Sequence, residues 1–395
     1  MKKIGIVSCY FQPNYGSMLQ AYATQRALEK LGFENETIDI SGFNHDIRKK
    51  KIKYFIKASF TSKILFTKLG RLRGVVIQRL KKNEYTKNIQ IRKNAFDRFE
   101  KKYFNMSKVY NSIDELGQEC VNYRAILVGS DQLWLPCNIA ADYYTLNFVP
   151  TSINSIAYAT SFGQSELPDS IMKPTKSFLE RIKHISVREE TGAKLINDIT
   201  GRKVPVVCDP TLLFTGDEWK NIQEEKAIID GKYIFVYFLG NNFCHREFVK
   251  KLKNVTGMKV VCLPHIDEYV KADEDCSDVR LYNIDPGQFL NMIRYAEYVC
   301  TDSFHCSVFS IQYNKKFFAF KRFSDGNKQS TNSRLTNLFK SLGIENSLLC
   351  GDENINEVMK IKINYNSVNE HLKENRDVSY KYLKEAIEDK GSTDL

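Results

Sequence analysis

The sequence lacks the signals that mark several large classes of protein. No stretch approaches the ~18 apolar residues of a membrane-spanning helix, and no pair among the ten cysteines has the C-x-x-C spacing of a zinc ribbon or a thioredoxin-type site. A P-loop, a G-x-G-x-x-G fingerprint and a G-x-S-x-G nucleophile motif are also missing, and no set of histidines and carboxylates has metal-ligand spacing. We therefore expect chemistry that needs no bound metal and no cofactor.

The amino terminus begins like a secretion signal but does not continue as one. Lys2 and Lys3 precede an apolar run over residues 4–11, and Gln12 and Pro13 end this run too early for a signal peptide. Proteins without such a signal usually keep their cysteines as reduced thiols in the cytoplasm. We therefore expect a cytoplasmic protein.

The composition is that of an ordinary globular protein. Hydrophobic residues make up 43% of the chain and charged residues 27%, which excludes wholesale disorder, collagen and a small disulfide-held scaffold. At ~150 residues per domain, a length of 395 residues suggests two or three domains.

The positive charge of the chain is concentrated in one segment. The net charge is +11, but residues 48–108 hold 20 basic and 3 acidic side chains, so this segment carries +17 and the rest carries −6. Apolar residues interrupt the basic ones at helical spacing, which predicts helices with an apolar and a basic face. The basic face is either solvated or in contact with an anionic lipid surface or lipid-linked acceptor. No zinc-finger spacing or RNA-binding aromatic strand accompanies it, so we expect no nucleic acid.

Alternating strand and helix patterns indicate an α/β protein with two successive series of elements. The predicted strands lie at residues 3–8, 35–40, 124–128, 155–160, 185–187, 204–208, 233–239, 259–263, 298–301 and 317–320. The predicted helices lie at residues 17–31, 171–182, 189–197, 245–254, 286–295, 305–313, 333–342 and 378–389.

Two such series predict two Rossmann-like domains with a ligand cleft between them, at the carboxyl ends of the strands. We expect an N-terminal domain over residues 1–220, with a basic helical insertion at about residues 45–110. A C-terminal domain over residues 221–375 follows, and residues 376–395 form a last helix and a tail.

Polar residues that follow predicted strands are the candidate site residues of the first domain. Asn14 and Gly16 precede a helix whose free N–H groups suit an anion, although an ordinary N-cap looks the same. The stretch 130–132, Ser130-Asp131-Gln132, offers a carboxylate and an amide to a sugar, or forms a capped turn. Arg188 is placed to bind a phosphate or carboxylate, or to pair with Glu189 or Glu190.

The second domain offers a histidine and several cations at equivalent places. Ser303 and His305 follow the strand at 298–301, where a histidine is either catalytic or structural. Lys321 and Arg322 end the next strand, and Arg334 begins the next helix, so cations recur on the side of the expected cleft.

Taken together and in order, several short stretches resemble the polysaccharide pyruvyl transferase family. They are N-Y-G at 14–16, L-Q-A-Y-A at 19–23, V-G-S-D-Q-L-W at 128–134, Y-A-T-S-F-G at 158–163, S-V-R-E at 186–189, D-P-T-L at 209–212 and T-D-S-F-H at 301–305. Each is short, but their joint occurrence in this order is specific.

The resemblance implies a GT-B-like fold and an activity. The activity is transfer of the pyruvyl group of phosphoenolpyruvate to a sugar of a cell-surface polysaccharide or its lipid-linked precursor, usually as a cyclic ketal. It implies His305 as the acid/base and Asp131 as a group that orients the acceptor hydroxyls. Arg188 is the first candidate to bind the donor anion, ahead of Arg322 and Arg334.

Two departures from the family pattern concern the donor site. Ser303 stands where many ketal-forming members carry an arginine, so we expect Lys321 or Arg322 to supply that contact. Cys306 stands where glycine is common, and a thiol at a helix start is an alternative proton donor. The competing functions are a GT-B-type glycosyltransferase that uses a nucleotide sugar and a non-catalytic surface-binding protein.

Overall fold

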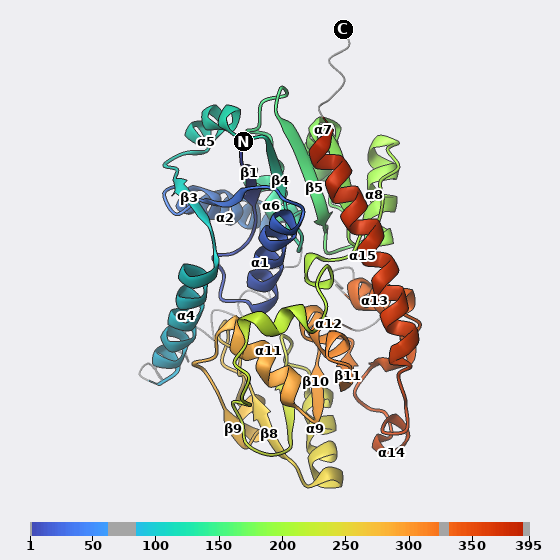
Figure 1. Cartoon of the computed structure of the whole chain (residues 1–395). Helices are drawn as coiled ribbons and strands as arrows, with labels where there is room; N and C mark the ends of the chain where they lie inside the picture. Colours follow the sequence, from blue (N-terminus) through green and yellow to red (C-terminus); the bar gives the residue numbers. More distant parts are fainter. Residues whose placement is uncertain (1, 62–83, 324–331, 390–395) are drawn as a thin grey trace.

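The protein consists of two halves, each built on a six-stranded parallel sheet (Figure 1). The computed structural model describes residues 2–61, 84–323 and 332–389. The strand order of the first sheet is β3-β2-β1-β4-β5-β6, the classical order of a dinucleotide-binding fold. Its strands are β1 Ile4–Val7, β2 Asn35–Asp39, β3 Met106–Val109, β4 Ala125–Val128, β5 Asn154–Thr160 and β6 His184–Val187.

The second sheet has the same connectivity. Its order, β12-β11-β10-β7-β8-β9, is the first order read from the other edge, and every described strand pair in both sheets is parallel. The predicted pair of Rossmann-like domains is therefore confirmed. The strands are β7 Tyr233–Tyr237, β8 Lys259–Cys262, β9 Val279–Arg280, β10 Tyr298–Thr301, β11 Lys316–Phe320 and β12 Leu348–Leu349.

Helices connect the parallel strands and cover both sheets (Figure 1). In the first half they are α1 Tyr15–Lys30, α2 Asn44–Thr61, α4 Glu84–Tyr103, α5 Ile113–Glu119, α6 Pro136–Ala141, α7 Asp169–Arg181 and α8 Glu190–Thr200. In the second half they are α9 Phe243–Thr256, α10 Lys271–Asp275, α11 Pro286–Tyr295, α12 Phe304–Gln312, α13 Ser333–Ser341, α14 Ile355–Val358 and α15 Tyr365–Glu388.

Two predictions about strands were wrong. The expected strand at 204–208 is only a bridge between Val206 and Val187, because Pro205 has no N–H to donate to a ladder. The expected helical insertion is helical in α2 and α4, but it also contains β3, which pairs with β2 at the edge of the first sheet. The sequence did not predict β3, because so short a strand forms only through its pairing with a neighbouring strand. Residues 62–83 of the predicted helical insertion lie outside the described residues.

The last helix is longer than the sequence indicated. We expected it to begin at Val378, but α15 runs unbroken from Tyr365, so residue 375 lies inside it. Its first residue, Tyr365, contacts the carbonyl of Lys315 in the second half of the protein, and Leu372 packs on the apolar core that both halves share. Its end packs Leu383 and Ile387 on the first half (Figure 1). The chain therefore crosses back, and α15 ties the two halves together.

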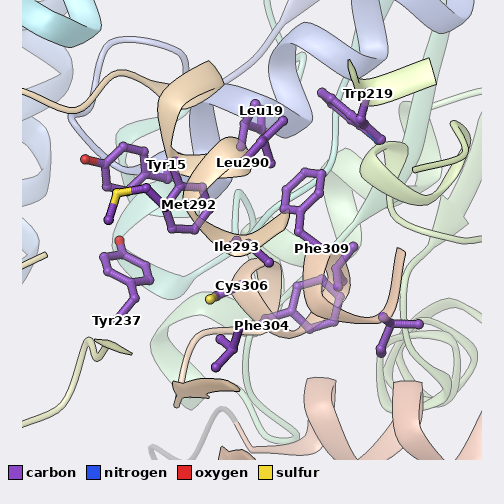
Figure 2. Close-up of a cluster of buried hydrophobic side chains, with 14 of the residues drawn as sticks. Tyr15, Leu19, Trp219, Tyr237, Leu290, Met292, Ile293, Phe304, Cys306 and Phe309 are labelled. Atoms are coloured by element: carbon purple, nitrogen blue, oxygen red, sulfur yellow. The ribbon is translucent and has the colours of Figure 1, made fainter. Parts of the chain in front are cut away.

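A continuous apolar core also joins the halves (Figure 2). Tyr15 of α1 stacks on Phe289 of α11 at 4.4 Å between ring centroids and donates a hydrogen bond to the carbonyl of Ile284 at 2.9 Å. From the insertion, buried Arg92 of α4 donates to the carbonyls of Leu281 and Tyr282 at 2.8 and 3.0 Å. These contacts set the carboxyl ends of the two sheets opposite one another.

Candidate active site

A cavity of about 310 Å³ lies between the carboxyl ends of the two sheets. The chain that follows β1 and β4 forms one wall, and the chain that follows β7, β10 and β11 forms the other. In each sheet, β1 with β4 and β7 with β10 are the adjacent strands at which the order reverses, the usual ligand position of such sheets. Of the predicted site residues, those that line the cavity are Asn14, Asp131, Gln132, Ser303, His305, Arg322 and Arg334.

His305 lies at the junction of the two halves. Ser303 caps α12 by accepting a hydrogen bond from the backbone N–H of Cys306, which places His305 in the first turn of the helix. The first turn of α1 packs directly on its ring. A Cβ atom built on Gly16 would lie 2.0 Å from His305 Nδ1, so only glycine leaves room for the imidazole. Gly16 is thus needed for this close approach.

A buried aspartate faces the other side of the His305 ring. Asp209 Oδ2 lies 3.6 Å from His305 Nε2 and accepts hydrogen bonds from Ser130 Oγ at 2.9 Å and Arg188 Nη1 at 2.7 Å. Thr211 donates two more, to Oδ1. Burial alone would raise the pKa of Asp209, but His305 and Arg188 outweigh it and hold the pKa below its usual value. Asp209 is therefore an ionised group that can orient the ring and balance a positive charge on it.

Arg188 supports this carboxylate from behind the cavity. Besides Asp209, its guanidinium contacts Glu189 at 3.4 Å and lies 4.0 Å from Asp131. It also lies over the ring of Phe304, 4.6 Å from the centroid. Arg188 is buried and does not line the cavity. In this structure it holds the acidic groups in place.

Asp131 presents its carboxylate to the cavity from the end of β4. Its φ of 81° is a left-handed conformation that aspartate tolerates better than most residues. Its Oδ2 accepts a hydrogen bond of 2.6 Å from Ser17 Oγ, in the first turn of α1. Burial raises the pKa of Asp131, but the charges of His305 and Arg188 lower it below the usual value. Asp131 is thus an anionic acceptor facing the open space.

The opposite wall is cationic. Arg322 follows β11, and its Nη2 donates to the carbonyl of Asp302 at 2.9 Å. Arg334 lies in the first turn of α13, and its buried Nε has no hydrogen-bond partner among the described residues. Burial lowers the pKa of Arg334, and the charge of Arg188 lowers it further. Within the described residues Arg334 forms no ion pair, as expected of a group that binds an anion.

Three of the other predicted residues lie outside the cavity wall. Ser130 donates to Asp209 and to the carbonyl of Ala159, so it acts behind the wall. Gly16 lies against His305, and Lys321 is partly buried beyond the end of β11. Cys306, the alternative proton donor, is fully buried in the apolar core (Figure 2), and burial raises the pKa of its thiol to about 12. That alternative is therefore wrong.

Two site residues were missed from the sequence. Asp209 lies in one of the stretches that carry the resemblance, but nothing in its local pattern shows that it meets His305 across the junction. Lys51 of α2 lines the cavity together with Tyr144, and its Nζ lies 5.8 Å from the centroid of that ring. Because Lys51 is one of 20 cations in the basic segment, the sequence could not distinguish it.

The described ranges contain no cluster of three or more histidine, cysteine, aspartate or glutamate side chains able to hold a metal ion. Among the helices of the described residues, none combines the length and the apolar character needed to cross a membrane.

Comparisons with known proteins agree with this architecture. The family model described as polysaccharide pyruvyl transferase matches residues 14–322. The chain is similar in structure to UDP-GlcNAc 2-epimerase from Methanocaldococcus jannaschii, with a TM-score of 0.51 and 12% identity over 92% of this chain and 93% of that one. A putative UDP-N-acetylglucosamine 2-epimerase from Listeria monocytogenes gives a TM-score of 0.52 at 10% identity, over 100% and 99%. No curated protein gives a significant match. The predicted GT-B-like fold is confirmed.

Proposed function

Because the chain belongs to the polysaccharide pyruvyl transferase family and is therefore a transferase, we propose that it moves the pyruvyl group of phosphoenolpyruvate onto a sugar. The acceptor is a cell-surface polysaccharide or its lipid-linked precursor, and the product is a ketal. One observation carries the proposal: His305, with the buried carboxylate of Asp209 behind it, lines the same cavity as Arg334, which forms no ion pair within the described residues. Phosphoenolpyruvate has the matching features, an enol carbon to protonate and two anionic groups.

The donor lies against the wall of the second half. Its phosphate or carboxylate binds Arg334, with Arg322 beside it, since both guanidinium groups line the cavity. Many ketal-forming members of the family carry an arginine at the position of Ser303. In this chain Arg334 and Arg322 supply that contact instead. Arg188, the first candidate for this contact, serves the donor indirectly by holding Asp209 and Asp131.

The chemistry follows from the positions of the acid and the base. His305 donates a proton to the methylene carbon of the enol, and positive charge develops on the carbon that bears the phosphate oxygen. A sugar hydroxyl adds to this carbon while Asp131 accepts its proton. The bond from the same carbon to the phosphate oxygen breaks, phosphate leaves with the proton held by Asp131, and a second hydroxyl closes the ketal ring as its proton passes to His305. Asp209 stabilises the imidazolium that forms when the proton of the second hydroxyl reaches His305.

The wall of the first half receives the acceptor. Gln132 offers its side-chain amide, whose Nε2 has no hydrogen-bond partner among the described residues, and Asn14 and Asp131 lie near it in the wall. Such amide and carboxylate groups suit sugar hydroxyls, which both donate and accept hydrogen bonds. Because phosphoenolpyruvate is a cytoplasmic metabolite, the proposal places the enzyme in the cytoplasm, at the inner face of the membrane where lipid-linked precursors are found.

The experiment combines the protein with phosphoenolpyruvate and candidate lipid-linked or nitrophenyl glycosides and measures phosphate release. Release that depends on both substrates is expected. A thermal-shift assay separates this function from that of a nucleotide-sugar glycosyltransferase on the same fold. Stabilisation by phosphoenolpyruvate supports the proposal, whereas stabilisation by a nucleoside diphosphate alone contradicts it.

A further inference from the structure

Helix α2 has two functional faces. Its inner face packs Ile47 and Tyr54 on the core of the first half and directs Lys51 to the cavity. Its outer face presents Ile52 and Ile56, which are 58% and 55% exposed. Phe55, 43% exposed, lies between them along the chain and packs edge-to-face on Tyr54 at 5.7 Å. Residues at i, i+3 and i+4 share one side of a helix, so the three side chains form an apolar stripe.

This arrangement is the reverse of an ordinary surface helix, which turns its polar face to water. The other large exposed hydrophobic side chains of the described residues occur singly along the chain. Only in α2 do three fall within five positions. Single exposed apolar residues need no explanation, but a cluster marks a surface that binds something. The other examples in the described residues are Ile91, Val109, Val121, Phe243, Val255 and Val378.

The charge around the stripe identifies the occupant. Helix α2 carries six basic residues at positions 48, 49, 50, 51, 53 and 57, and its one acidic residue is Asp46. Arg48, Lys49 and Lys53 are exposed beside the stripe. Apolar residues flanked by cations on one exposed face are typical of a helix that lies in the interface of an anionic bilayer. A nucleic acid would use the cations but has no complement for the two isoleucines.

We propose that α2 docks the enzyme on an anionic lipid surface, with Ile52 and Ile56 entering the headgroup region and Arg48, Lys49 and Lys53 contacting the headgroups. The evidence for this docking comes from α2 alone and does not depend on the proposed function. One consequence rests on the proposed function: because a helix is ~10 Å across, docking brings the cavity wall at Lys51 within one helix diameter of the bilayer. A sugar held near the surface by a lipid carrier then lies close to the cavity.

The test is sedimentation of the full chain with vesicles of phosphatidylcholine, with and without phosphatidylglycerol. Binding is expected only with phosphatidylglycerol and should fall as salt rises. The double variant Ile52→Ser/Ile56→Ser should lose at least tenfold in partition coefficient. Lys49→Glu/Lys53→Glu should lose about fivefold for each lysine. The matched control is Val255→Ser/Val378→Ser, two residues 54% and 57% exposed on other helices, and it should bind like the wild type.

Several results would overturn the docking. The wild-type protein could bind equally well with and without phosphatidylglycerol, or the double isoleucine variant could bind as tightly as the wild type. Duplex DNA at the same charge concentration could also abolish vesicle binding. Sedimentation velocity without lipid adds another: a wild-type dimer that the isoleucine variant converts to monomer shows that a second copy covers the stripe. Phosphate release with a soluble nitrophenyl glycoside should be equal in wild type and variant, so failed docking is distinguishable from a failed proposed function.

Discussion

The two walls of the cavity have opposite chemistry. The first half contributes the carboxylate of Asp131, with buried Asp209 behind the wall, whereas the second half contributes His305 and the guanidinium groups of Arg322 and Arg334. Yet the first half also contains the segment that carries the chain's whole excess of positive charge. Net charge therefore does not locate the anion site. The proposed anion site is at Arg334, which forms no ion pair within the described residues, whereas Lys51 alone among the described cations of the basic segment lines the cavity.

The buried carboxylate of Asp209, behind the wall of the first half, should stabilise the fold as well as serve the chemistry. The Asp209→Asn variant tests this. Losing one partner of a buried ion pair costs about 3–5 kcal/mol, since Arg188 keeps its charge. The pKa of Asp209 in the folded protein is below the unfolded value of 3.8. Its stabilisation is therefore complete above pH 3.8 and is lost as the pH falls toward the folded pKa.

Urea unfolding as a function of pH measures this effect. The wild-type protein should exceed the variant in stability at neutral pH, and the difference should shrink below pH 3.8. Asp198→Asn, at an exposed carboxylate paired with Lys194, is the control and should change little. A pH-independent difference would show that the lost hydrogen bonds, rather than the charge of Asp209, explain the effect.

Contact between the walls is tested at Gly16. A methyl group there would lie 2.0 Å from His305 Nδ1, so Gly16→Ala must displace the imidazole. A shift of about 1 Å typically costs 10²-fold in rate, which we expect in kcat for phosphate release. Gly192→Ala in α8 is the control, because its new methyl group would be 3.4 Å from Val187 and fits. Full activity of Gly16→Ala would mean that the position of His305 is unimportant.

The cationic wall is tested at Arg334. Removing a charge-assisted hydrogen bond costs about 1.5–3 kcal/mol, so Arg334→Met should raise KM for phosphoenolpyruvate about 10- to 150-fold. The KM for a glycoside acceptor should stay near the wild-type value. Arg280→Met, an exposed arginine of the same half, serves as the control. If acceptor KM rises and donor KM does not, the substrates bind the walls in the opposite order.

The smallest effect is expected at Lys51, a cation of the basic segment that lines the cavity. Its partly exposed ammonium group contributes about 1 kcal/mol to an anionic ligand, so Lys51→Met should raise acceptor KM about fivefold. This increase should be confined to acceptors that carry a phosphate-linked lipid. Lys50→Met, an exposed neighbour, should have no effect. An equal increase with uncharged glycosides would remove Lys51 from phosphate binding.

Much of the fold followed from local patterns. Ten strands were predicted, and nine of them occur, because runs such as 233–237 are apolar on both faces and belong inside a parallel sheet. The missed strands β9 and β12 have two residues each, and β3 has four. Such short segments become strands only through their neighbours. No local pattern contains that information.

The site was predictable where it follows a strand and unpredictable where it depends on distant partners. His305, Asp131 and Arg322 each follow a strand, so the edge of the sheet places them together. Arg188 also follows a strand, but Asp209, 21 residues later, draws its guanidinium behind the wall. The sequence does not show this contact with Asp209, and for that reason it favours Arg188 over Arg334 as the donor contact.

The most direct test follows the pyruvyl group itself. Phosphoenolpyruvate labelled in its pyruvyl carbons is combined with a glycan acceptor and the enzyme, and label in the glycan is compared with free phosphate. Equal amounts of both are expected for the wild type, and both rates should fall about 10³-fold in His305→Ala. Phosphate released without labelled glycan, or transfer undiminished in His305→Ala, would contradict the proposed function.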